Sequence, residues 1–327
     1  MAEASEKIRM RRVQRLGTSS LVVTLPKEWV RRVNLKPGDT VYVVIEGGSV
    51  RIIPSSGATE AFRSMSVDVS RLPDGLSVAK LISCAYVSRV DVLRLEGVGW
   101  EAALEARSIA SRLMGVDVSS GEGYLEIRTV LDDSRVKARD IIENVVRLAS
   151  DLLGLAKRLV ESPSQQLIQL AREAIHEIVK YEHLVVRRLN AGVPTEETAL
   201  LYAVGIAIVA AADLWHLTNY LATIAEQRGR VEVDRERLEK LLGLVERVLR
   251  LLASVAEKPS LDEAVRLTRE AENAKMEAWR ATLDAPTPQD AVAATHVYHA
   301  LRNLELASNA LLCHTLHATQ RGKHGQA

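Results

Sequence analysis

The hydrophobic and polar positions divide the chain into three zones with different periodicities. In the first zone, roughly residues 8–56, short apolar and β-branched runs alternate with glycine, proline and polar residues, a pattern typical of strands. Gly47 and Gly48 accept the positive φ of a hairpin turn. We predict strands at 21–25, 41–45 and 50–53, a short helix at 26–33, and a turn at Lys36-Pro37-Gly38-Asp39.

The second zone, residues 61–131, alternates between patterns of strand and helix. Strands are predicted at 65–69, 90–95 and 124–131, and helices at 76–88 and 100–114. This alternation indicates a small α/β layer that links the other two zones. The nearest approach to a phosphate loop, Glu96-Gly97-Val98-Gly99, lacks the spacing of a dinucleotide fingerprint, so a structural role is favoured.

The third zone, residues 134–321, has helical periodicity and repeats internally. Ser162-Pro163-Ser164 corresponds to Lys258-Pro259-Ser260 about a hundred residues later, and each combines a cap residue with proline. Helix starts are predicted near Ser134, Ser164, Thr195, Asp234, Ser260 and Pro288. Two three-helix units, 134–230 and 234–321, would bury one another's apolar faces. The predicted fold class is therefore multidomain α+β, with domains at 8–56, 61–131 and 134–321.

The amino-acid composition indicates what kind of hydrophobic core the protein has and in which cellular compartment it is expected. Aromatic residues make up only 4% of the 327 residues, so the cores must be aliphatic. The two cysteines, Cys84 and Cys313, lie far apart and form no disulfide framework, which favours a reducing, cytoplasmic setting. Cys84 lies in an apolar run and is expected to be a buried thiol. The uncharged stretch 199–212 is short for a membrane span, so we expect a buried core helix and no membrane insertion.

Charge is concentrated in the first zone. Residues 7–36 carry nine Lys or Arg and a single acid, Glu28, whereas the whole chain has a net charge of only +1. Such asymmetry favours a polyanion partner for this zone, and a merely solvated basic face is the alternative. Residues predicted to contact phosphates of double-stranded DNA are Arg11, Arg12, Arg15, Thr18, Ser19, Ser20, Lys27, Arg31 and Arg32. A β-rich unit this small buries too little surface to be stable alone, which predicts a homodimer or higher assembly.

The first zone resembles the swapped-hairpin DNA-binding domains of the SpoVT, AbrB and MazE group. The resemblance is carried by Arg12-Val13-Gln14-Arg15-Leu16-Gly17, by Leu21 to Trp29, and by Leu35-Lys36-Pro37-Gly38-Asp39 with the hairpin that follows. It implies that two chains interlace into one β-barrel and that the basic residues lie along DNA.

The third zone resembles the phosphate-uptake regulator family PhoU, whose two repeats each have three helices. The third helix of each PhoU repeat carries a pair of metal-binding acids. At these positions the present chain has Trp215 and Asn219 in the first repeat, and Glu305 and Asn309 in the second. We therefore expect no metal site and no cofactor. The order of domains is similar to that of archaeal PhoU-type regulators, which implies a role in phosphate uptake or homeostasis.

Other candidate chemistry remains weak. Glu173-x-x-His176 and Asp213-x-x-His216 have the form of di-iron ligand pairs, but two further glutamates are not identifiable. His296-x-x-His299 with Glu305 is equally loose, and no catalytic triad is recognised. We therefore do not expect an enzyme.

Three hypotheses remain open, of which a metal-dependent enzyme that holds stoichiometric metal is the third. The leading hypothesis is a DNA-binding transcriptional regulator with a PhoU-like sensing or interaction bundle. In the alternative, the bundle modulates a phosphate transporter or sensor protein, and the first zone only dimerises.

Overall fold

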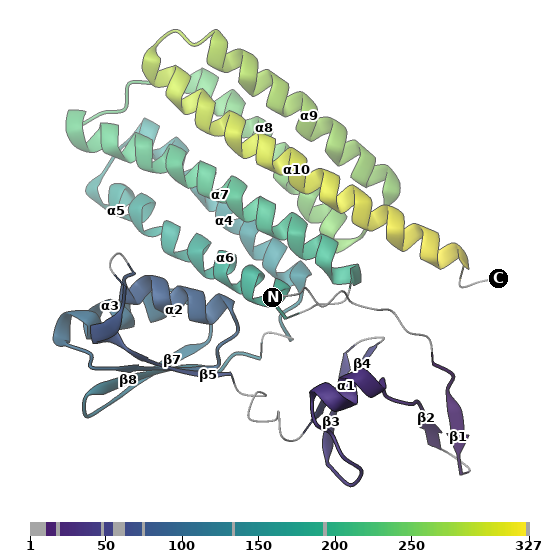
Figure 1. Ribbon diagram of the computed structural model, residues 1–327. Helices are drawn as coiled ribbons and strands as arrows, with labels where there is room; N and C mark the ends of the chain where they lie inside the picture. The colour runs from purple at the N-terminus through teal and green to yellow at the C-terminus, as the bar shows by residue number, and fades with distance from the viewer. Residues whose placement is uncertain are drawn as a thin grey trace. The chain divides into compact units, whose positions relative to one another are not determined.

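The structure is a computed structural model that describes residues 11–17, 20–46, 49–54, 63–73, 76–132, 135–191 and 195–324. The chain divides into two compact units, residues 1–62 and 63–327. The second unit contains both an α/β layer and a helical bundle (Figure 1). The protein is thus mostly helical and belongs to the multidomain α+β class.

The first unit consists of two separate hairpins joined by a short helix (Figure 1). Strands β1 (Gln14–Leu16) and β2 (Ser20–Val22) pair antiparallel, as do β3 (Val41–Glu46) and β4 (Ser49–Pro54). Helix α1 (Lys27–Arg32) lies between the hairpins in sequence. The predicted strand at 21–25 was wrong in extent: β2 ends at Val22, and the extended segment that follows pairs with no described strand. Strand β1 was not predicted. Gly47 and Gly48 lie outside the described residues.

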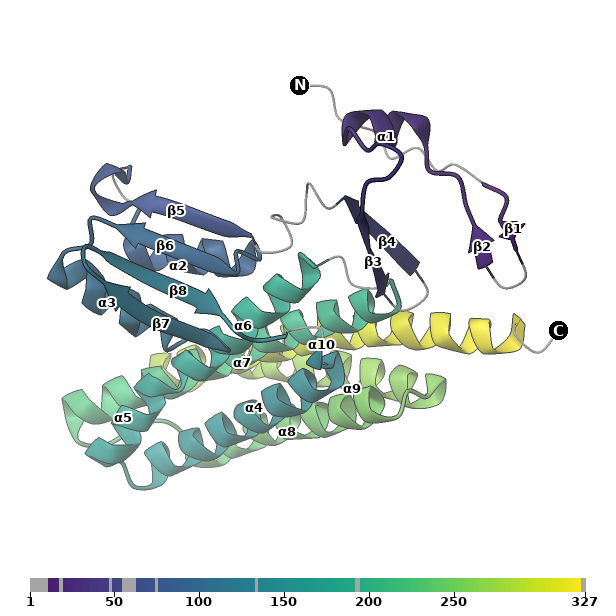
Figure 2. The same cartoon turned by 90° about the horizontal axis from the view of Figure 1, so that it is seen from below.

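The α/β layer contains a four-stranded sheet in the order β5-β6-β8-β7. Strands β5 and β6 are parallel, and the other neighbours are antiparallel. Two helices cover one face of this sheet (Figure 2). The elements are β5 (Ser64–Asp68), the 3-10 helix η2 (Val69–Arg71), α2 (Val78–Val87), β6 (Val92–Glu96), α3 (Trp100–Ala110), β7 (Val116–Gly121) and β8 (Tyr124–Thr129).

The core of this layer is formed by residues that recur at strand spacing in the sheet and at helical spacing in α2. Leu93 and Leu95 of β6 lie opposite Ile127 and Leu125 of β8, so the buried positions alternate along both strands. Helix α2 buries Val78, Leu81, Ile82, Ala85 and Tyr86, which share one face at helical spacing. Cys84 lies on the opposite face and is exposed, so the prediction of a buried thiol was wrong.

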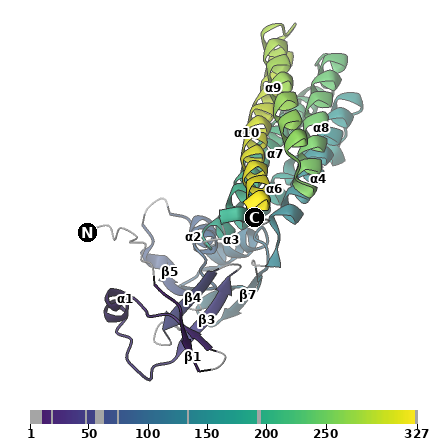
Figure 3. The ribbon, with the colours of Figure 1, turned by 90° about the vertical axis from the view of Figure 1, so that its right-hand side faces the viewer.

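The bundle is made of long helices packed side by side (Figure 3). They are α4 (Ala138–Glu161), α5 (Gln165–Glu173), α6 (Ile175–Leu189), α7 (Thr195–Arg228), α8 (Arg235–Glu257), α9 (Leu261–Leu283) and α10 (Pro288–His324). Their shared core is aliphatic and includes Leu152, Leu217 and Leu242. The first helix begins at Ala138, later than predicted, and Ser134 lies outside the described residues.

Three of the helix starts are set by side-chain caps. Ser164 accepts a hydrogen bond from the backbone of Leu167, and Asp234 accepts one from the backbone of Arg237. At the start of α10, Thr287 accepts from the backbone of Asp290 and donates to its carboxylate. The other oxygen of Asp290 accepts from the backbone of Asp234 at 2.7 Å, so the starts of α8 and α10 are tied together.

Helix α7 combines length with low polarity. Its residues Glu197–Arg228 would be long and apolar enough to cross a membrane, a test that core helices also meet. In this structure α7 packs against α4, α6 and α10, and Leu201, Leu214 and Leu221 are completely buried. The predicted stretch 199–212 is therefore part of the bundle core.

Candidate nucleic-acid interface

The first hairpin presents arginine side chains to solvent. Arg11, Arg12 and Arg15 are all exposed, and Arg15 lies directly opposite Leu21 across the β1–β2 pair. Gly17 has φ +68° at the end of β1, a conformation that glycine adopts without strain. The strand pairing places the arginine-bearing β1 beside β2, with Leu16 opposite the polar Ser20.

Helix α1 adds two further cations on one face. Lys27 and Arg31 are four residues apart and exposed, whereas Trp29 and Val30 are half-buried. Pro26 precedes the helix with extended φ and ψ, which fits a residue without a backbone donor. Asn34 ends the helix at φ 52°, and the amide of Leu35 donates to the carbonyl of Val30.

A tight turn connects α1 to the second hairpin. Pro37 and Gly38 occupy its central positions, and Gly38 has φ +94°. The backbone amide of Asp39 donates to the carbonyl of Lys36, and the Asp39 carboxylate accepts from the amide of Lys36 at 2.7 Å. These two hydrogen bonds between Lys36 and Asp39 close the turn and thereby fix where β3 begins.

The structure places the predicted phosphate-contacting residues as follows. Arg11, Arg12, Arg15, Ser20, Lys27 and Arg31 are exposed on β1, β2, α1 and the segment before β1. Arg32 ends α1, and its side chain is not described. Thr18 and Ser19 lie outside the described residues. The assignment of these residues to DNA contact therefore stays a prediction.

The second hairpin has an apolar face that its own chain leaves uncovered. The β3–β4 register puts Val41, Val43, Val50 and Ile52 on one face. Val43 and Val50 are 60% and 61% exposed. Among the described side chains between residues 11 and 54, none is buried. A second apolar surface is needed to complete a core here.

The bundle contains a second group of polar side chains, between α7 and α10. The Asp213 carboxylate accepts a hydrogen bond of 2.7 Å from the Asn303 amide. The rings of His216 and His296 stack with centroids 6.1 Å apart. Burial raises the pKa of Asp213, against the opposing effects of Asn303, His299 and His216. Burial, and then the charges of His216 and His299, lower the pKa of His296.

These side chains do not form the sites considered from the sequence. Glu305 forms an ion pair with Lys275 at 2.6 Å. Glu173 and His176 line a separate groove on α5 and α6. Within the described ranges, no three His, Cys, Asp or Glu side chains gather as metal ligands would.

The histidine cluster predicts how stability depends on pH. The His296 imidazole ordinarily titrates at 6.5, and its pKa is lower in the folded protein, so below that pH the unfolded chain binds more protons. The free energy of unfolding should therefore fall as pH drops from 7 to 5. Asp213, with its raised pKa, contributes with the opposite sign, since the folded state keeps its proton to higher pH.

Urea unfolding across this pH range tests the assignment. We expect His296→Gln to flatten the fall in stability and Asp213→Asn to steepen it. His176→Gln, which removes a histidine outside the cluster, is the control. An unchanged pH profile in the His296 variant would contradict the assignment.

Sequence reasoning missed a buried arginine between the α/β layer and the bundle. Arg187 of α6 is 2% exposed. It donates to the carbonyl of Tyr86 at 2.8 Å and to the carboxylate of Asp91 at 3.0 Å. In the sequence Leu184-Val185-Val186-Arg187-Arg188-Leu189, the signal was its helical spacing from the core residue Leu184, three positions earlier.

Comparison with known proteins bears on the first unit. Residues 14–59 match the family described as antidote-toxin recognition MazE, bacterial antitoxin. The match covers β1 through β4 and supports a domain similar to MazE and AbrB there. No curated protein and no solved structure matches the chain.

Proposed function

We propose that this protein is a DNA-binding transcriptional regulator. Its MazE- and AbrB-like segment is compatible with such a role, because domains of this kind typically dimerise and bind DNA. The observation that carries the proposal is the coincidence, within residues 11–54, of exposed basic side chains and an uncovered apolar face. The first suits a phosphate backbone and the second suits a partner chain.

In the proposed assembly, two chains interlace into one β-barrel. Val41, Val43, Val50 and Ile52 of each chain would pack against their counterparts, and the arginines near β1 would lie outside this core. The bundle would act as a PhoU-like sensing or interaction module in a cytoplasmic, non-enzymatic regulator. Control of phosphate uptake is the role that the PhoU resemblance implies.

Substitution at the apolar face tests the dimer. Val43→Lys should convert the protein to a monomer, because a charge in a closed apolar interface lacks a partner. Sedimentation equilibrium of the full chain measures this. Thr40→Lys adds the same charge at an exposed position before β3 and should leave the dimer intact. A Val43→Lys protein that remains dimeric would overturn the proposed interface.

Binding to DNA is tested with the full-length protein and a duplex from its own promoter region. Fluorescence anisotropy at several salt concentrations should give affinity that falls linearly with salt on a double logarithmic scale. Genome-wide mapping of bound sites then tests the phosphate role through the neighbouring genes. A dimer that binds no duplex in a salt-sensitive manner would favour the alternative, in which the bundle modulates a transporter or sensor protein.

A further inference from the structure

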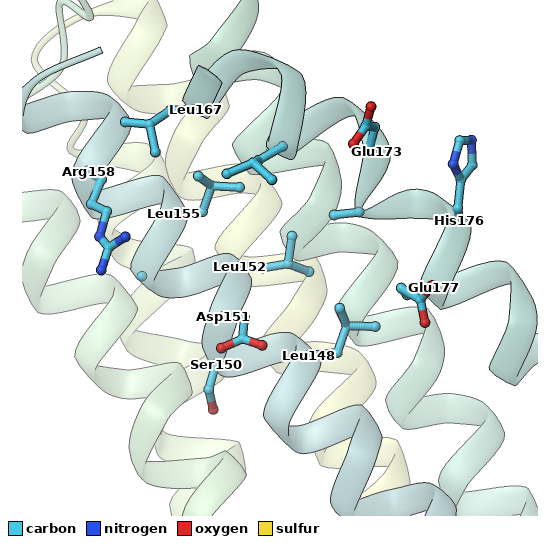
Figure 4. Close-up of a pocket in the computed structure, with 13 residues that line it drawn as sticks. Leu148, Ser150, Asp151, Leu152, Leu155, Arg158, Leu167, Glu173, His176 and Glu177 are labelled. Atoms are coloured by element: carbon cyan, nitrogen blue, oxygen red, sulfur yellow. The ribbon is translucent and has the colours of Figure 1, made fainter. Parts of the chain in front are cut away.

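A groove runs along the first repeat of the bundle, between α4, α5 and α6. It has a volume of about 660 Å³. Its floor is formed by leucines of α4 and α5, namely Leu148, Leu152, Leu155 and Leu167 (Figure 4). Leu170 of α5 also lines the groove. Leu170 is 48% exposed although it belongs to this apolar surface. The three leucines of α4 recur at the spacing of a helix-packing seam, over about two turns.

The second repeat shows the same surface with charged side chains in place of much of the apolar lining. Ser260 stands at the N-cap position of α9, 96 residues after Ser164 at the N-cap position of α5, so the two repeats can be compared position by position. The corresponding hollow has about 370 Å³ and is lined largely by charged residues. There Arg247 bonds to Glu270 at 3.0 Å across the hollow. Arg250 and Arg266 stand where the first repeat has Gly154 and Leu170. Both repeats are hollowed at this place, and the apolar lining and larger volume belong to the first repeat.

Two backbone features accompany the groove. Helix α9 runs unbroken through Glu270, whereas the equivalent residue of the first repeat, Ala174, separates α5 from α6. Gly154 lies in the interior of α4, where glycine costs about 0.5–1 kcal/mol relative to alanine. A Cβ added at Gly154 would meet nothing within 4 Å, so no contact within the chain requires glycine there. The open space suits the close approach of another molecule.

The charges around the groove are unequal. Glu173 and Glu177 lie toward one end and Arg158 toward the other, with Asp151 beside the leucines of α4 (Figure 4). Glu177 pairs with Lys180, and Glu173 accepts a hydrogen bond only from the neutral Gln169 among the described side chains. Asp151 forms no ion pair with any described side chain. An occupant with basic groups would therefore be favoured.

We propose that this groove binds a basic amphipathic helix of a partner protein. The groove is open along its length, whereas sites for small molecules enclose most of the ligand surface. An apolar seam with acidic flanks suits a helix that presents large apolar residues at positions i, i+4 and i+7 and lysine or arginine beside them. This inference deepens the proposed interaction role of the bundle, but it is independent of DNA binding by residues 11–54.

The test uses the full-length protein and a labelled synthetic peptide of about 18 residues, since shorter helices are marginal in water. The peptide carries leucines on one face and lysines on the other. A second peptide replaces lysine with glutamate, and a third has the same composition in scrambled order. Fluorescence anisotropy should show binding of the lysine peptide, binding weaker by about tenfold or more for the glutamate peptide, and none for the scrambled peptide.

Variants copied from the second repeat locate the site. Gly154→Arg and Leu170→Arg should each weaken binding of the lysine peptide by roughly tenfold or more, since they fill or charge the apolar floor. Leu170 is exposed and a Cβ at Gly154 meets no atom within 4 Å, so the fold should persist, as urea unfolding will check. Gly243→Ala, a helix-interior glycine of α8 outside the groove, is the matched control and should bind normally.

Several outcomes would overturn the proposal. These are no binding of the lysine peptide, equal binding of the glutamate or scrambled peptide, and unchanged binding by both groove variants. A change in oligomeric state with Gly154→Arg would assign the groove to a contact between copies instead. DNA binding measured in the same variants should be unchanged, so a failure here remains distinct from a failure of the proposed regulator.

Discussion

Replacing Arg11, Arg12 and Arg15 together by alanine is expected to lower both the affinity for duplex DNA and its salt dependence. Each phosphate contact contributes about 0.9 to the slope of log affinity against log salt. A dimer would lose six arginines, so the slope should fall by up to about 5. Between 50 and 200 mM salt, each phosphate contact makes the affinity fall about 3.5-fold further. Loss of one contact therefore makes the total fall about 3.5-fold smaller. Anisotropy titrations over this range measure both quantities.

A charge-matched variant separates local contact from net charge. Arg139, Arg250 and Arg266 are exposed arginines of the bundle, and their replacement by alanine removes the same charge from each chain. That control should keep most of the slope, because the proposed phosphate contacts are confined to the first unit. Equal loss in the two triple variants would contradict a localised interface. Both proteins should remain dimeric, since none of these residues belongs to the apolar face of β3–β4.

Much of the fold could be predicted because local chemistry and tertiary structure agree. Ser164 and Asp234 were recognised as helix starts and cap their helices through side-chain hydrogen bonds. The Pro37-Gly38 turn was recognised because proline and glycine favour the backbone conformations of a turn. In the α/β layer, the alternation in β6 and β8 was visible because one face of each strand is buried.

The failures occurred where the signal depended on distant partners. Strand β7 reads as a polar loop after Val118, and its strand form comes from pairing with β8 alone. The interruption between α5 and α6 at Ala174 could not be predicted, because no glycine or proline stands there. Cys84 was judged from an apolar run, whereas the period of α2 turns it outward.

The groove could have been predicted only in part. Leu148, Leu152 and Leu155 lie at helical spacing on one face of α4, but an apolar face is normally assigned to a core. Comparison of the two repeats at an interval of 96 residues would have revealed that Leu167 and Leu170 correspond to Glu263 and Arg266. The volume between α4, α5 and α6 could not be inferred, because it depends on how the helices diverge.

The second large effect is expected at Arg187, which joins the α/β layer to the bundle. The carbonyls of Tyr86 and Val87 belong to the last turn of α2, where the helix dipole is negative. Arg187 donates to the first of these carbonyls, and Asn190 donates to the second at 2.8 Å. The Arg187 guanidinium also lies 5.0 Å from the centre of the Tyr86 ring.

Arg187→Met should therefore destabilise the second unit by about 3–5 kcal/mol, because it leaves the Asp91 carboxylate without its buried partner. Arg187→Lys should recover only part of this, since one ammonium group cannot serve the carboxylate and the carbonyl in the same geometry. Arg172→Met breaks the exposed pair with Glu226 and should cost less than about 1 kcal/mol. Urea unfolding measures all three.

Hydrogen exchange tests where that destabilisation falls. With the bond to Asp91 lost, the amides of α2 and of strands β5 to β8 should exchange faster, because the layer would open without unfolding the bundle. The core amides of α7 and α10 should keep their protection, since these two helices pack mainly against each other and against α4 and α9. Uniform loss of protection across both parts would instead mean that the layer and the bundle unfold as one cooperative unit. In that case Arg187 would stabilise the whole of residues 63–324, and the layer could not move independently to transmit a signal from the bundle.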